Sequence, residues 1–176
     1  RGIRRISNAD ILIADGTPLS PELLARHHAG AGQHRLAIDA WIRAADSAIS
    51  AAAFGDALEH LDQARSSLPD VPANDQHELA LIIELRAMST LIQSVGPADP
   101  EVDAVCRRAR ELALGNGTAR QQYQAAWGSW FVHLMRGEIN TARPLGDEVL
   151  ELAETLEDQS LQLEAHHVQW SGLSLA

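Results

Sequence analysis

The stretch from Asp39 to Pro69, DAWIRAADSAISAAAFGDALEHLDQARSSLP, decides the fold class of this chain. Its apolar residues recur at spacings of three and four, as expected when one face of an α-helix is buried. The pattern falls into two blocks, which begin and end with small or polar residues. The stretch therefore predicts two packed helices, over residues 33–50 and 54–68.

Bulky and small side chains in this stretch stand at fixed offsets. Trp41 precedes Ala45 by four residues, and they are followed by Ala57, Leu61, Ala64 and Pro69. In these positions the stretch resembles a tetratricopeptide repeat. The bulky residue of such a repeat fills the space between neighbours, the alanines let two helices approach closely, and the proline terminates the second helix.

The helical pattern continues along the rest of the chain. Breaks rich in Gly and Pro separate further predicted helices over 21–30, 76–95, 100–114, 119–136, 139–157 and 160–176. The pair from Tyr123 to Leu156 matches the repeat more loosely, with Trp130 at the first small-residue position and Ala142 in the place of Ala57. The turns recur at a pitch of roughly 40 to 43 residues, above the ~34 of an ordinary tetratricopeptide repeat.

These patterns predict an all-α protein built as a right-handed array of antiparallel helix pairs, a tetratricopeptide-like superhelix. Residues 1–19 are expected to form a linker or the end of a preceding domain. Residues 20–176 are expected to form the helical repeat domain, truncated at its C-terminal end. Pro144 fits this scheme only if its helix begins near Asn140 or Thr141, where first-turn amides are unpaired anyway.

Composition excludes several classes of function. The formal net charge is −10, and all 14 basic residues are Arg. An acidic surface repels phosphate backbones, which argues against nucleic-acid binding. Without Lys, the chain has neither a P-loop lysine nor a Schiff-base lysine. The single cysteine, Cys106, cannot form an internal disulfide, and no apolar run spans a membrane, so we expect a cytoplasmic protein.

Five segments carry a more specific resemblance. They are Pro21–Gly32, Ala37–Trp41, Ala57–Leu61, Asp99–Val102 and Arg107–Leu112. Together they are similar to the tetratricopeptide-like region of large bacterial signalling ATPases. The resemblance implies that an ATPase module and a cyclase, kinase or LuxR-type DNA-binding output lie elsewhere in a longer parent chain, which could have ATPase or nucleotide cyclase activity. The first residue, Arg1, fits an excised piece of such a protein.

The candidate binding residues lie on one predicted helix. Trp127, Phe131, Leu134 and Met135 share a broad face by three- and four-residue spacing, whereas Trp130 is expected between helices. Trp127, Phe131 and Leu134 are predicted to face a concave groove that could receive a partner or ligand. The competing interpretation is that these large side chains simply fill the core.

Catalytic, cofactor and metal sites are not predicted. The adjacent histidine pairs His27–His28 and His166–His167 cannot each clamp one ion, because neighbours on a helix point about 100° apart. Glutamates between 148 and 157 have the spacing of a solvated face. Cys106 is interpreted as a buried structural thiol rather than as a nucleophile.

The sequence thus favours a non-catalytic protein-interaction or sensor segment. Its partner would be another protein, neighbouring domains of the same chain or a small-molecule inducer. A homo-oligomerisation scaffold and a small-ligand-binding helical domain are the alternatives. The oligomeric state stays open at this level.

Overall fold

A computed structural model describes residues 19–156 and 158–173 of the chain. These residues form eight α-helices and one short 3-10 turn, without a strand. The helices are α1 (Pro21–Gly30), α2 (His34–Ser50), α3 (Phe54–Ser66), α4 (Ala73–Ser94), α5 (Pro100–Asn116), α6 (Ala119–Met135), α7 (Ile139–Thr155) and α8 (Gln159–Leu173), with the 3-10 turn at Leu68–Asp70. The all-α prediction is confirmed. Residues 1–18, which cover most of the predicted linker, lie outside the described part.

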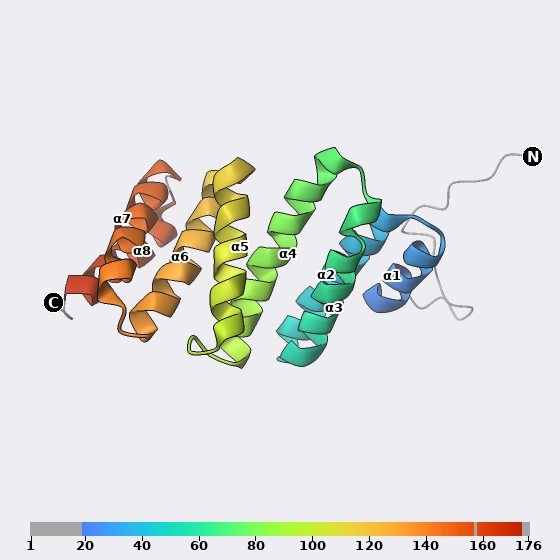
Figure 1. The fold of residues 1–176 in the computed structure, drawn as a ribbon, viewed down its shortest axis with the longest axis horizontal. Coiled ribbons are helices and arrows are strands. Elements are labelled where there is room, and N and C mark those ends of the chain that lie inside the picture. The colour runs from blue at the N-terminus through green and yellow to red at the C-terminus, as the bar shows by residue number, and fades with distance from the viewer. Residues whose placement is uncertain (1–18, 157, 174–176) are drawn as a thin grey trace, which may run out of the picture.

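The helices follow one another along the longest axis of the molecule (Figure 1). Each helix packs chiefly against the helices before and after it in the chain. In addition, α4 contacts both α2 and α6, the helices two places away on either side. The result is an extended stack in which α2, α4, α6 and α8 are successive members of one row, and α3, α5 and α7 of the other.

Polar side chains define where several helices begin. The hydroxyl of Ser20 accepts a hydrogen bond from the backbone N–H of Leu23, at 3.3 Å, just before Pro21 opens α1. The carboxylate of Asp99 accepts from the N–H of Glu101 at 2.8 Å, and Pro100 then opens α5. Both starts combine a side-chain cap with a proline at the first helical position, where no amide hydrogen is needed.

Three of the tight turns between helices share one hydrogen-bond pattern. After α1, α2 and α6, a backbone N–H reaches back five residues, from Gln33 to His28, from Ala53 to Ala48 and from Glu138 to His133, each at 2.9 Å. This bond closes a helix end when the preceding residue has positive φ. Gly32 and Gly137 occupy that position at 69° and 72°, but in the middle turn it is Ala52, at 56°.

The residues predicted to pack the repeats lie mostly in the interior. Trp41 is buried, with its ring stacked on His60 at a centroid distance of 5.4 Å. The small residues and the second bulky residue are buried as well: Ala45, Ala57, Leu61, Ala64, Trp130 and Ala142. Pro69 is exposed and lies within the 3-10 turn, three residues after Ser66, the last residue of α3.

Helix limits differ from the sequence-based prediction in a few places. α4 begins at Ala73, three residues before the expected start at 76, because the chain re-enters a helix directly after Pro72. α7 begins at Ile139, so Pro144 lies in its second turn rather than its first, and the helix loses the bond to the carbonyl of Asn140 there. Residues 174–176 of the last predicted helix lie outside the described part.

None of the described helices is both long enough and apolar enough to cross a membrane.

Candidate binding groove

A cavity of about 830 Å³ opens along the row formed by α2, α4, α6 and α8. All its lining residues come from these four helices, and none comes from α3, α5 or α7. The apolar lining residues are Ile49, Ile82, Leu85, Met88, Ile92, Trp127, Phe131 and Leu161. We call this cavity the groove. One row of helices therefore presents a continuous, largely apolar surface.

Two aromatic rings form the central feature of the groove wall. Trp127 and Phe131 are one turn apart on α6, and their rings are stacked with a centroid distance of 5.5 Å and an interplanar angle of 3°. Both rings are half-buried. They therefore have a free surface that another apolar group could cover.

The other members of the predicted site lie elsewhere. Leu134 is half-buried and lies outside the groove lining, although it packs against the same core of α6, α7 and α8 as Trp127 and Phe131 do. Met135 is the last residue of α6, rotated by about 80° from Trp127, and it is 57% exposed. Trp130 is buried between helices, in the place predicted for it.

Glycine at position 128 shapes the floor of the groove. A Cβ atom built there would lie 2.5 Å from Cε of Met88, so any larger residue would require the end of this methionine side chain to move. Gly128 is not among the residues that the sequence predicts for the site. Its signal is a residue without a side chain in the middle of the aromatic run Trp127-Gly128-Ser129-Trp130.

The two arginines that line the groove are each paired with a carboxylate. The guanidinium of Arg86 donates to Asp46 at 2.8 Å, which joins α4 to α2. Arg120 of α6 donates to Asp158, just before α8, at 2.8 Å. This hydrogen bond is the main reason why the pKa of the Asp158 carboxyl is lowered. Both of these arginine charges are thus neutralised by a carboxylate.

Tyr123 links the groove to the last helix. Its hydroxyl donates to a carboxylate oxygen of Glu164 at 3.3 Å. Burial of the phenol, followed by the negative charge of Glu164, raises the pKa of Tyr123 to about 12. The phenol therefore stays protonated at neutral pH and serves as a hydrogen-bond donor.

A second, more polar cavity of about 500 Å³ continues the groove. It shares Arg120, Gln121 and Gln124 with the groove. Its remaining lining residues come from the start of α4 and the turn between α5 and α6: Asn74, His77, Glu78, Leu81, Asn116 and Thr118. The cleft between α4 and α6 thus changes from polar to apolar along its length.

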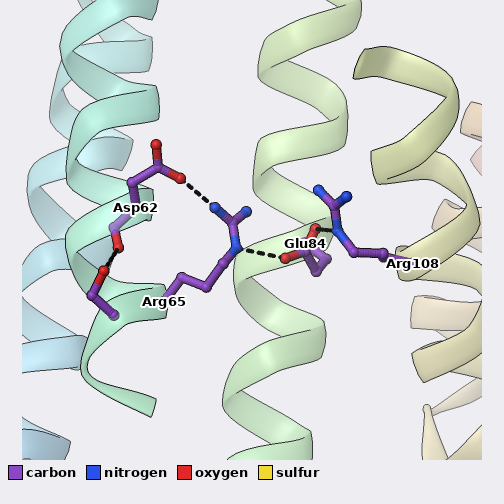
Figure 2. A network of polar contacts seen from close by, with 5 residues as sticks. Asp62, Arg65, Glu84 and Arg108 are labelled. Carbon is purple, nitrogen blue, oxygen red and sulfur yellow. Dashed lines mark hydrogen bonds and ion pairs between the residues drawn. The ribbon is translucent and has the colours of Figure 1, made fainter. Parts of the chain in front are cut away.

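An ion network outside the groove fixes the neighbouring helices. Glu84 of α4 is only 5% exposed, and its two carboxylate oxygens accept from Arg65 of α3 at 2.8 Å and from Arg108 of α5 at 3.0 Å (Figure 2). Arg65 also pairs with Asp62 on its own helix. The carboxylate bridges three consecutive helices, and so fixes how α3 and α5 sit on α4.

The single thiol is buried, and the described histidines belong to no group of side chains that could hold a metal ion. Cys106 is buried, and this burial, followed by the charge of Asp103, raises the pKa of its thiol to about 11. A thiol so far from ionisation is a poor nucleophile at neutral pH. Within the described part of the chain, no three His, Cys, Asp or Glu side chains are grouped so that they could hold a metal ion.

Comparison with models of protein families, with curated proteins and with solved structures finds no match to this chain.

Proposed function

We propose that this chain is the non-catalytic sensor or protein-interaction segment of a multidomain bacterial signalling regulator in the cytoplasm. The parent protein would couple an ATPase to a cyclase, kinase or DNA-binding output. The observation that carries the proposal is the groove, whose wall presents the stacked and half-buried rings of Trp127 and Phe131. Occupation of this groove would be the event that the parent protein detects.

We further propose that the helices form a right-handed, tetratricopeptide-like superhelix. Polar contacts at a regular sequence separation support this arrangement. Asp46 pairs with Arg86, 40 residues on, whereas Arg110 pairs with Glu148 and Arg120 with Asp158, each 38 residues on. Such contacts join helices two places apart in the chain, as a repeated helix pair requires.

The size of the groove suits a binding role. Small-molecule sites in proteins enclose roughly 300 to 1,000 Å³ and are mostly apolar with a few polar groups. The groove, at about 830 Å³, falls in this range and combines apolar side chains with the phenol of Tyr123. A ligand bound there would touch α2, α4, α6 and α8 together, and could therefore change how these helices sit on one another.

The proposal is tested by comparing two forms of the chain. Random 12-residue peptides on a display library and a set of bacterial metabolites are screened against the wild type and against the Trp127→Ala, Phe131→Ala double variant. We expect to find ligands that bind the wild type at least about tenfold more tightly than they bind the double variant, because the two truncations remove the aromatic surface. Leu23→Ala, which removes a leucine 52% exposed on α1, is the matched control and should bind like the wild type.

Two results would overturn the proposal. Ligands that bind both forms equally would show that the groove is not the binding site. Turnover of ATP or formation of a cyclic nucleotide by the isolated chain would show that it is catalytic.

A second candidate function rests on α8. Leu163 of this helix is 75% exposed, and such a side chain at the end of a stack could pack against a second copy of the chain. In this case the segment would be a homo-oligomerisation scaffold. Sedimentation equilibrium distinguishes the two: a mass that rises with concentration and falls in Leu163→Asp favours the scaffold, whereas a constant monomer mass excludes it.

A further inference from the structure

The cleft between α4 and α6 has a polar end and an apolar end. The polar end lies at the start of both helices, near His77 and Thr118, and the apolar end lies farther along, at Ile92 and Phe131. Thr118 and Phe131 are thirteen residues apart, and thus roughly 20 Å apart along the helix. A ligand that lies along this cleft meets two different kinds of surface.

The apolar end offers little to a polar ligand. The hydroxyl of Ser89 already donates to the carbonyl of Arg86 at 3.0 Å, and the amide of Gln93 donates to the carbonyl of Ser89 at 3.0 Å. An extended peptide has an N–H and a C=O group in every residue, and these would lose water without gaining partners here. A hydrocarbon chain over Trp127 and Phe131 has no such cost.

The polar end offers both donors and acceptors. Nε2 of His77 lies 3.0 Å from the carbonyl oxygen of Leu112 and must donate to it, which leaves Nδ1 of the neutral ring as an acceptor. The side-chain oxygen of Gln121 accepts from Thr118, which leaves its amide nitrogen as a donor. Gln124 makes no side-chain hydrogen bond to another described residue, so its amide can both donate and accept.

The charges along the cleft disfavour an anionic ligand. Arg86 and Arg120 are each held by a carboxylate, and Glu164 accepts from the hydroxyl of Tyr123. An anionic head group would have to displace a carboxylate from one of these arginines, and at the polar end it would also meet the exposed carboxylate of Glu78. A neutral group with both donors and acceptors, such as an amide, can pair with the free atoms of His77, Gln121 and Gln124.

We propose that this cleft binds a neutral, elongated amphipathic small molecule. Its amide-like head group lies between the N-terminal ends of α4 and α6, against His77, Gln121 and Gln124. Its hydrocarbon tail lies on Trp127 and Phe131. This inference rests on the proposed function, because it names the class of ligand that occupies the same groove.

Calorimetric titration with four probes tests the ligand class. N-octanoylglycinamide has both parts, N-acetylglycinamide lacks the tail, 1-octanol lacks the amide head, and N-octanoylglycine replaces the neutral head by a carboxylate. We expect N-octanoylglycinamide to bind at least about tenfold more tightly than each of the other three, because only it matches both ends of the cleft.

Two variants assign the ends of the ligand. Gln124→Leu should reduce the preference for N-octanoylglycinamide over 1-octanol and leave the affinity for 1-octanol unchanged. Phe131→Ala should weaken both probes. Gln63→Leu, the same substitution at an exposed glutamine of α3 away from the cleft, is the matched control and should change neither affinity.

The outcomes separate this inference from the proposed function. If N-octanoylglycinamide binds no better than N-acetylglycinamide, or N-octanoylglycine binds best, the ligand class is wrong. If the probes fail but peptides from the display screen bind in a manner that requires Trp127 and Phe131, the inference falls and the proposed function stands. If neither probes nor library ligands distinguish the wild type from the double variant, both fall.

Discussion

Single polar side chains link the helices of this mostly apolar stack to one another. Glu84 is the clearest case, since its carboxylate lies almost out of reach of water between the guanidinium groups of Arg65 and Arg108. Tyr123 is another, because its buried phenol must find an acceptor and finds Glu164. Each residue ties its own helix to a neighbour through a contact that a purely apolar side chain could not make.

Removal of the carboxylate at position 84 should destabilise the protein. Breaking a buried ion pair costs about 3 to 5 kcal/mol. Both arginines here are partly exposed and regain water when the carboxylate is removed. We therefore expect Glu84→Ala to lower the free energy of unfolding by about 1 to 3 kcal/mol. Urea denaturation measures this value. Glu78→Ala, at an exposed site on the same helix, should change it by less than about 0.5 kcal/mol. Equal effects of the two substitutions would contradict a bridging role for Glu84.

Tyr123 should ionise only at high pH. It is the single tyrosine of the chain, so absorbance near 295 nm follows it alone, and we expect a midpoint near pH 12 in the folded protein. A raised pKa means that the native state favours the protonated phenol. The stabilisation is complete below about pH 10, the usual pKa of tyrosine, and is lost as the pH rises towards 12.

Glu164→Gln tests the cause of this shift. It removes the negative charge but leaves the burial, so the midpoint should fall and yet stay above the usual value of about 10. A midpoint unchanged by the substitution would show that Glu164 has no part in the shift.

At the scale of the helices, the turns that close the helix ends contribute to stability, as the buried faces do. In the turns after α1, α2 and α6, a backbone N–H donates to the carbonyl oxygen five residues earlier. This hydrogen bond needs a residue with positive φ just before the donor. Gly32 and Gly137 adopt this conformation without strain. Ala52 does not, because its Cβ approaches the following carbonyl oxygen when the backbone is left-handed.

Glycine should therefore stabilise the turn between α2 and α3. The left-handed conformation costs a non-glycine residue about 1 to 2 kcal/mol, and glycine avoids this cost. The greater freedom of glycine in the unfolded chain offsets part of the gain. Ala52→Gly should therefore raise the free energy of unfolding by about 0.5 to 1 kcal/mol. Urea denaturation detects this change. Ala51→Gly, at the neighbouring residue with φ of −90°, should lower stability instead. A loss of stability in Ala52→Gly would show that the turn is not strained.

At the scale of the whole molecule, the stack has two connected cores. One core joins α1 to α5, and the other joins α6, α7 and α8 around Trp130, Val149 and Val168. Val132 and Ala125 on α6 belong to the first core, whereas Trp130 and Ala126 belong to the second, so α6 connects the two. The groove crosses this connection, which lets one ligand touch both cores.

Stability should vary along the stack. The inner helices are covered on both sides, whereas α1 and α8 have a described neighbour on one side only. We therefore expect native-state hydrogen exchange to show the highest protection in α4 and α6 and the lowest in α1 and α8. Equal protection in all helices would mean that the chain unfolds as one cooperative unit.

The amino-acid sequence by itself determined the helical class, the approximate helix limits and the burial of residues such as Trp41 and Ala57. These features depend on local spacing and on caps such as Asp99 and Thr118, which act within one or two turns of chain. The sequence also placed Trp127 and Phe131 on a common face, one turn apart.

Only the tertiary structure decided which residues share the groove. Periodicity places Leu134 on the same broad face as Trp127, but Leu134 lies outside the groove lining, and Met135 lies exposed at the helix end. Likewise, no local pattern shows that Glu84 faces arginines 19 and 24 residues away, or that the end of Met88 packs against Gly128. The physical reason is that a helix pattern states which face is buried, whereas the packing of the other helices decides what that face meets.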